Sequence, residues 1–233
     1  MEILWKGETE AADRIRKGTE ILANEAGDAA EALAVSVKFW EKEELYVKRE
    51  GGQVEICCKE PAHYFRALNR ALHWPAGQAM EQTETVYFPK NGFMLDCSRN
   101  SVFTADTVKA LIRKLARVGM NVLMLYTEET YEVPGKPYFG IYRGRYSREE
   151  IREMDAYAQL FGIELVPCIQ TLAHLRNTLK WPYGAELQDS EDILMVGEEK
   201  VYAFIEDLLS AVKESFSTRR VHLGMDEAVH LGL

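Results

Sequence analysis

Two patterns of hydrophobic and polar residues divide the chain into two parts. In the first part, Leu33–Phe39 and Gln53–Cys58 alternate between apolar and polar residues, which is typical of strands with one buried face. The glycine pair at 51–52 favours a hairpin turn directly before the second of these stretches. The next stretch, Ala62–Leu72, follows a proline and has apolar residues at helical spacing, which predicts a helix. We therefore expect a small α+β domain over residues 1–85.

In the second part, short apolar runs alternate with amphipathic segments. The apolar runs predict buried strands. These runs are Gly92–Cys97, Asn121–Tyr126, Ile163–Ile169 and Arg220–Met225. The segments between them predict helices over 104–118, 147–161 and 198–216, with Thr104 capping the first helix and Ser147 and Glu150 forming a capping box on the second. Strand–helix alternation predicts an α/β fold with a parallel sheet, either doubly wound or a β/α barrel. No glycine-rich phosphate motif follows any of the runs.

Composition and charge narrow the function classes. The chain has 233 residues, of which 47% are hydrophobic and 28% charged, as in ordinary globular proteins. Its net charge of −9 argues against a nucleic-acid partner, and no run is long and apolar enough for a membrane-spanning helix. The first residues lack the apolar core of a secretory signal. The four cysteines have neither zinc nor disulfide spacing, so we expect buried free thiols and a cytoplasmic protein.

An Asp-Glu pair directly follows the fourth apolar run. Asp226 and Glu227 are either solvated loop carboxylates or a functional pair at a strand tip, where β/α barrels present their catalytic acids. Neighbouring side chains of a regular strand point to opposite faces, so a shared site requires the chain to bend at this pair. The chemistry then needs one protonated carboxyl as a general acid and one ionised carboxylate.

Polar residues also follow the other three runs. Asp96 and Arg99 lie at the end of the first run, as an ion pair that ties the loop to the barrel or as direct substrate contacts. Glu128 and Glu129 come after the second, either solvated or on the same rim as the Asp-Glu pair. His174 comes after the third, as a buried hydrogen-bonded histidine or a partner of the acid. Together these positions predict one site at the carboxyl ends of the strands.

Aromatic residues crowd the two long segments that follow the second and third runs. Such rings stack on the apolar faces of sugars, but they also pack loops in many proteins. The residues are Tyr131, Tyr138, Phe139, Tyr142, Tyr146, Trp181 and Tyr183.

The motifs Gly92–Asn100 and His222–Glu227, together with His174, resemble glycoside hydrolase family 20, the β-N-acetylhexosaminidases. The resemblance covers about residues 85–233, and the preceding part is similar to the small α/β domain of that family. It implies that residues 86–233 form the first four strands of a TIM (β/α)8 barrel. The family's barrel has eight strands, so we expect an incomplete barrel and a fragment that is inactive alone.

The resemblance also implies roles for the site residues. Glu227 is the general acid/base, and Asp226 holds the 2-acetamido group, whose carbonyl oxygen attacks the anomeric carbon with retention of configuration. His174 and Glu128 buffer the charge of the acid, and Asp96 supports the site. The substrate-binding residues are expected to be Asn91, Arg99 and Glu129; the first of these stands where many members have an arginine.

The implied substrate is a terminal GlcNAc or GalNAc of a glycan, removed by an exo-acting enzyme without metal or organic cofactor. We also expect neither a nucleic-acid nor a membrane partner. Two alternatives remain: a glycosidase with a direct carboxylate nucleophile, and a non-catalytic carbohydrate-binding remnant. Dependence on the 2-acetamido group separates the first alternative from the substrate-assisted route.

Overall fold

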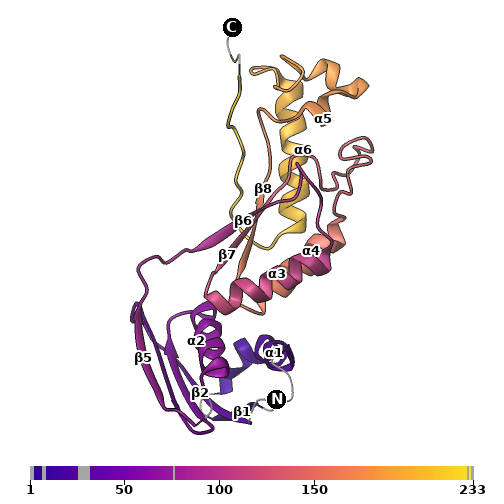
Figure 1. Ribbon diagram of the computed structural model, residues 1–233. Coiled ribbons are helices and arrows are strands. Elements are labelled where there is room, and N and C mark those ends of the chain that lie inside the picture. The colour runs from indigo at the N-terminus through magenta and orange to yellow at the C-terminus, as the bar shows by residue number, and fades with distance from the viewer. Residues whose placement is uncertain (1–2, 7–8, 26–31, 76, 230, 232–233) are drawn as a thin grey trace. The chain divides into compact units, whose positions relative to one another are not determined.

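The computed structural model describes residues 3–6, 9–25, 32–75, 77–229 and 231, and it shows an α/β protein with two sheets (Figure 1). The chain forms two compact units. The first unit comprises Met1–Gly92, Lys109–Val122 and Tyr157–Glu164, and the second comprises Phe93–Val108, Leu123–Ala156 and Leu165–Leu233. The helices α3 (Ala105–Val118) and α4 (Arg148–Gln159) therefore contribute residues to both units.

The first unit is built on a five-stranded sheet with the order β1-β2-β4-β3-β5. The strands are β1 (Ile3–Lys6), β2 (Leu33–Phe39), β3 (Glu44–Glu50), β4 (Gln53–Cys58) and β5 (Met80–Thr85). Strand β2 runs parallel to β1 and β4, whereas β3 is antiparallel to β4 and β5. Two helices, α1 (Thr9–Glu25) and α2 (Pro61–His73), lie against this sheet (Figure 1). Buried residues alternate along β2, β3 and the first part of β4, so one face of the sheet forms the core.

Several elements of the first unit confirm the sequence prediction. The bounds of β2 and β4 are as expected, and Glu50 pairs with Gln53 across a turn whose Gly51 has a φ of 55°. Helix α2 begins at Pro61 and buries Phe65 and Leu68 completely. Three elements were not predicted: β1, α1 and β5. Only Met80 of β5 is buried, so this edge strand has no apolar pattern and depends on backbone pairing with β3. By contrast, Ile15 and Leu22 of α1 are buried at helical spacing, a signal that the sequence did contain.

The second unit contains most of a three-stranded sheet with the order β6-β7-β8. Its strands are β6 (Gly92–Asp96), β7 (Val122–Tyr126) and β8 (Glu164–Cys168), and α3 and α4 connect them as the alternation predicted. Both predicted caps are present. The Thr107 N–H donates to Thr104 Oγ1 at 3.3 Å, and Ser147 and Glu150 exchange hydrogen bonds of 2.8 and 3.1 Å. After β8 come α5 (Arg176–Leu179), a 3₁₀ turn (Pro182–Glu186) and the long α6 (Glu199–Ser215).

The fourth apolar run is not a strand, which corrects the prediction for Arg220–Met225. His222 forms an isolated parallel bridge with Cys168, and Thr171 N–H donates to the Gly224 carbonyl at 3.1 Å. Gly224 has a φ of 59°, and a side chain there would meet the Ile169 carbonyl oxygen at 2.1 Å. This left-handed glycine interrupts the strand geometry beside β8. The segment is therefore extended and hydrogen-bonded to β8 without being a regular strand.

The first apolar run is a strand, but it is not buried as predicted. Phe93 and Met94 of β6 are exposed, whereas β8, at the opposite edge of the same sheet, is largely buried. The cysteine prediction is confirmed: all four cysteines are free and buried. Among the described residues, no helix combines the length and the apolar character needed to cross a membrane.

Candidate active site

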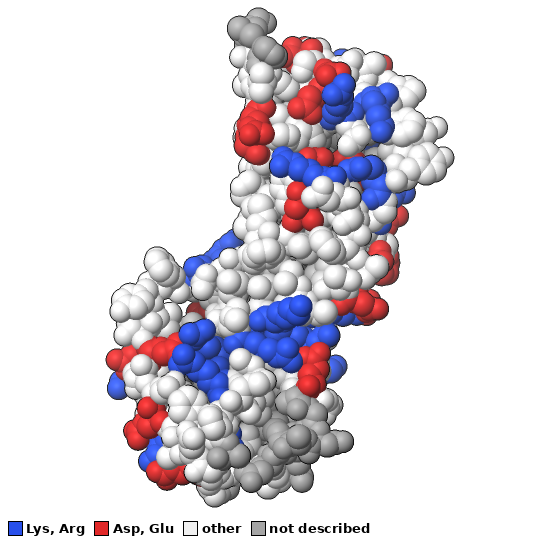
Figure 2. Space-filling model, viewed as in Figure 1, with Lys and Arg blue, Asp and Glu red and all other residues white. Residues whose placement is uncertain are grey.

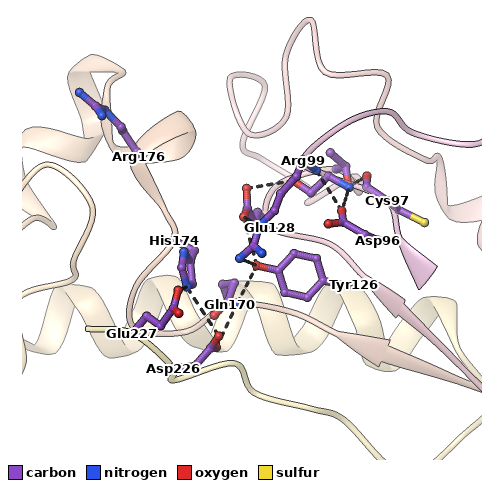
Figure 3. Close-up of polar contacts among 12 residues, drawn as sticks. Asp96, Cys97, Arg99, Tyr126, Glu128, Gln170, His174, Arg176, Asp226 and Glu227 are labelled. Carbon is purple, nitrogen blue, oxygen red and sulfur yellow. Dashed lines mark hydrogen bonds and ion pairs between the residues drawn. The ribbon is translucent and has the colours of Figure 1, made fainter. Parts of the chain in front are cut away.

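Asp226 and Glu227 turn toward one histidine. The His174 Nε2 atom lies 3.6 Å from Asp226 Oδ2 and 3.4 Å from Glu227 Oε2 (Figure 3). Both His174 and Glu227 have left-handed backbones, with φ values of 57° and 52°, which side-chain-bearing residues rarely adopt. The predicted bend at the Asp-Glu pair is therefore present, and it lets the two neighbouring carboxylates face the same group.

Asp226 is held in its ionised form. Its pKa is lowered, chiefly because its own backbone N–H donates to the carboxylate, and burial opposes this effect. Gln170 Nε2 lies 3.4 Å from Asp226 Oδ1 and adds to the lowering, as do His174 and His222. The same Gln170 amide donates to the Tyr126 hydroxyl at 3.1 Å. These contacts keep the Asp226 carboxylate charged.

Glu128 lies at the end of β7 and is buried. Ser98 Oγ donates to its Oε2 at 2.9 Å, and the Tyr126 hydroxyl donates to its Oε1 at 3.1 Å. Arg99 Nε lies 3.6 Å from the same carboxylate, and Arg99 Nη2 donates to the Tyr126 hydroxyl at 3.1 Å. Burial raises the pKa of Tyr126 to about 12, so its hydroxyl keeps its proton. A chain of hydrogen bonds therefore runs from Asp226 through Gln170 and Tyr126 to Glu128.

Glu129 is completely buried beside Arg143. The Arg143 Nε atom donates to Glu129 Oε1 at 2.6 Å, and Arg143 Nη2 donates to the Ser98 carbonyl at 2.8 Å. Burial raises the pKa of Glu129, and Arg143 opposes that shift. Glu129 Oε2 has no hydrogen-bond partner among the described residues. The possibility that Glu128 and Glu129 are solvated loop residues is wrong; a sugar contact by Glu129 stays a prediction.

Asp96 fixes the loop that follows β6. Its Oδ1 accepts hydrogen bonds of 2.9 Å from the backbone N–H groups of Ser98 and Arg99. The expected ion pair between Asp96 and Arg99 has a different form, because the Arg99 guanidinium pairs with Glu128 instead. A direct substrate contact by Asp96 or Arg99 stays a prediction.

Asn91 precedes β6 and belongs to the first unit. Its backbone N–H donates to Asn121 Oδ1 at 2.9 Å, and its carbonyl accepts from the Asn121 N–H at 2.9 Å. Asp96 lies at the other end of the same strand. The role of Asn91 in substrate binding at the Asp226 site stays a prediction.

The long segments contribute aromatic residues of two kinds. Tyr131, Phe139 and Tyr146 are buried and pack the loops. Tyr142 is exposed, and Tyr138 is exposed with its ring centroid 5.4 Å from that of Trp181. Only the second kind is available to a ligand.

The cluster suits proton transfer at an accessible surface. The ligating atoms of His174, Asp226 and Glu227 lie within 4.8 Å of one another, close enough for a metal ion in principle, but exposed acidic groups commonly lie this close without one. An ionised Asp226 and the exposed Glu227 carboxyl both lie within 3.6 Å of His174 Nε2, an arrangement that places two carboxyl groups and an imidazole together for acid–base catalysis. The sequence prediction missed Ser98, Tyr126, Arg143 and Gln170, which orient the carboxylates. Tyr126 ends one apolar run and Gln170 directly follows another, a signal that could have found them.

The chain is similar in sequence to curated β-hexosaminidases. The chain is 27% identical to a β-hexosaminidase of Vibrio furnissii over 177 residues, which cover 60% of this chain and 29% of that protein. It is 28% identical to human hexosaminidase D over 119 residues, covering 49% of this chain and 24% of that protein. The chain therefore spans less than a third of the length of these curated relatives.

Solved structures show the same fold. An N-acetyl-β-hexosaminidase of Streptomyces plicatus in complex with Thio-NAglucal superposes with a TM-score of 0.79 at 21% identity, covering 97% of this chain and 55% of that one. A β-N-acetylhexosaminidase of Streptomyces coelicolor A3(2) gives a TM-score of 0.74 at 21% identity, with 98% and 56% covered. Residues 88–231 match the glycosyl hydrolase family 20 catalytic domain, and the chain belongs to that family.

Proposed function

We propose that the chain belongs to an exo-acting β-N-acetylhexosaminidase that removes terminal GlcNAc or GalNAc with retention of configuration. The observation that carries this proposal is the convergence of Asp226 and Glu227 on His174 Nε2, at 3.6 and 3.4 Å. The family match and the curated β-hexosaminidase relatives support the substrate class.

In this proposal, the substrate supplies its own nucleophile. Asp226, ionised, accepts a hydrogen bond from the 2-acetamido N–H and orients the acetamido carbonyl oxygen toward the anomeric carbon. That oxygen forms a bond to the anomeric carbon while the glycosidic bond breaks, and Glu227 gives its proton to the leaving oxygen. Glu227 then takes a proton from water, which attacks the same carbon and regenerates the acetamido group. His174, within reach of both carboxylates, stabilises the charge that alternates on Glu227.

We further propose that residues 1–85 form an accessory α+β domain and that residues 86–233 form the first half of a (β/α)8 barrel. The exposed apolar residues at both edges of the second unit's sheet support this, because a closed barrel would cover them. They are Phe93 and Met94 on β6, and Leu223 and Met225 beside β8. The chain's share of its relatives' length supports the same interpretation.

The test is hydrolysis of an aryl β-N-acetylglucosaminide, with the aryl β-glucoside as control. Both are assayed on this chain and on any longer product of the same gene. Hydrolysis of the acetamido sugar alone supports the substrate-assisted route. Hydrolysis of the glucoside at a similar rate supports a direct carboxylate nucleophile, and binding without hydrolysis in every form supports a non-catalytic remnant. Either result would replace the proposal.

A further inference from the structure

The first unit contains a second place with the properties of a ligand site. A cavity of about 230 Å³ opens between α2, the end of β5 and the segment at 86–91. The residues that matter for its chemistry are His63, Arg66, Glu84, Tyr87, Phe88 and Asn91. None of them takes part in the hydrogen-bond network around Asp226 and Glu227.

Two aromatic side chains at this cavity are unusually open to solvent. Tyr87 is 81% exposed and Phe88 is 72% exposed, although they are neighbours. Exposing two adjacent large rings is unfavourable in water, and such a patch commonly marks a binding site. Flat, accessible rings suit a ligand with an apolar face, such as the C–H face of a pyranose ring.

The charges that line the cavity are paired with one another. Arg66 Nε donates to Glu84 Oε2 at 2.8 Å, and Arg70 forms a second ion pair with Glu84. On the face drawn in Figure 2, basic and acidic side chains lie side by side over the first unit. Arg66 Nη1 also donates to the Val118 carbonyl at 3.1 Å. Arg66 and Glu84 are the two lining residues with opposite charges, and they cancel each other, so the lining itself offers hydrogen-bond donors and acceptors without net charge, which favours a neutral polar ligand over an anion.

Two further polar side chains line the cavity, and the Asn91 amide is the one that is open to a ligand. The backbone of Asn91 is fixed by Asn121, while its exposed side chain has no partner in the described part of the chain. His63 is only 7% exposed, and its Nδ1 has no hydrogen-bond partner among the described residues. This nitrogen has almost no accessible surface, so it offers no contact for a ligand in the cavity. Burial lowers the pKa of His63, so the ring is neutral and can both donate and accept.

We propose that this cavity is a glycan-binding site that holds one neutral sugar residue. Phe88 stacks on the pyranose ring, and the Asn91 amide with the Arg66–Glu84 pair bonds the sugar hydroxyls. Vicinal hydroxyls present a donor and an acceptor side by side, which a carboxamide and an arginine–carboxylate pair both match. The site binds the glycan through a sugar residue other than the one that is cleaved. Binding at this cavity does not involve Glu227, so the inference can be correct or wrong independently of the proposed hydrolysis.

The test is a titration of the ¹⁵N-labelled chain followed by amide NMR. Chitotriose is the first probe, maltotriose is a second neutral sugar, and sodium sulfate is the anionic control. The Gly119 amide reports on the proposed cavity, because Gly119 is part of its wall, and the Gly224 amide reports on the segment before Asp226. A saturable shift of Gly119 with either sugar, and none with sulfate, is the expected result.

Variants separate the cavity from general surface binding. Phe88→Ala or Asn91→Ala should weaken the sugar affinity read at Gly119 by about tenfold, the loss of one stacking or hydrogen-bonding contact. Tyr202→Ala removes an exposed aromatic on α6 and should leave that affinity unchanged. A sugar titration that shifts Gly224 alone overturns the inference and leaves the proposed function intact. A Gly119 response to sulfate but not to sugar, or one unaffected by Phe88→Ala and Asn91→Ala, also overturns it.

Discussion

The two sides of the candidate active site hold their carboxylates in opposite ways. The Glu128 and Glu129 side chains are 10% and 1% exposed, whereas those of Asp226 and Glu227 are 54% and 73% exposed. The first pair has partners from Ser98, Tyr126, Arg99 and Arg143. Among the described residues, the side chains that contact the second pair are His174 and Gln170.

The difference separates carboxylates that stabilise the fold from carboxylates that can act on a substrate. A buried carboxylate loses its hydration, so it is tolerated only with well-placed donors, and removing a partner leaves an uncompensated group. An exposed carboxylate has no such cost and can exchange protons with a substrate. Tyr126 and Gln170 connect the two sides, since one donates to Glu128 and the other lies against Asp226. We therefore expect changes on the first side to affect folding and changes on the second side to affect turnover.

The largest expected effect follows from Glu227→Gln. The amide keeps the size of the side chain but can neither give nor take the proton, so kcat should fall by about 10²–10⁴-fold. Because the side chain is exposed, the free energy of unfolding should change by less than about 0.5 kcal/mol. Aryl β-N-acetylglucosaminide hydrolysis and urea unfolding measure the two quantities, the first in a form of the protein that turns over.

Glu128→Gln is the matched control for that variant. It makes the same change at a buried carboxylate with three neighbouring donors, so unfolding should become easier. If Glu227→Gln destabilised the chain more than Glu128→Gln does, it would be wrong to assign folding to the buried carboxylates and turnover to the exposed ones.

Arg143→Ala tests the buried side directly. It leaves the fully buried Glu129 without its cation, and breaking such a pair costs about 3–5 kcal/mol. The measurement is the midpoint and slope of urea unfolding at neutral pH. The double variant Glu129→Gln/Arg143→Met, which removes both charges, should recover part of that loss.

Arg176→Ala supplies the comparison for an exposed ion pair. Arg176 and Glu191 lie 3.0 Å apart with both side chains open to solvent, and such pairs contribute little to stability. Its unfolding free energy should stay within about 0.5 kcal/mol of the parent protein. Equal losses from Arg143→Ala and Arg176→Ala would show that Glu129 does not depend on its cation.

A smaller effect is expected from Ser98→Ala. This variant removes one hydrogen bond to Glu128, of 2.9 Å, while Tyr126 remains bonded to the same carboxylate. The loss should be about 1–3 kcal/mol because a buried acceptor loses a partner. Ser101→Ala, at an exposed position in the same loop, is the control and should be neutral in the same unfolding assay.

The sequence predicted the features that depend on the local pattern of residues. It did not predict the burial or exposure of residues whose surroundings come from other parts of the chain. The helices α2, α3, α4 and α6 and the strand pattern were readable because caps and apolar spacing lie within each segment. The bend at Glu227 was also predictable, since two neighbouring carboxylates cannot otherwise share a site. The burial of Glu129 was not, because its cation comes from Arg143, fourteen residues further along the chain. Likewise, an apolar run does not reveal whether other residues cover the strand: β6 is exposed, whereas β8, at the opposite edge, is buried.

The smallest expected effect concerns two thiols, one on each side of the site. Burial raises the pKa of both Cys97 and Cys168 to about 11, so about one thousandth of each is thiolate at pH 8, against about a quarter of an ordinary thiol. Both should resist a disulfide reagent in the folded protein. Cys168 should react faster than Cys97, because it is covered by the exposed His222 at 3.2 Å, whereas Cys97 lies against the buried Tyr146. The Cys97→Ser variant retains Cys168 and the Cys168→Ser variant retains Cys97, so their rates of reaction with the reagent at equal pH measure this difference. Equal rates would mean that the two sides of the site open together to admit the reagent.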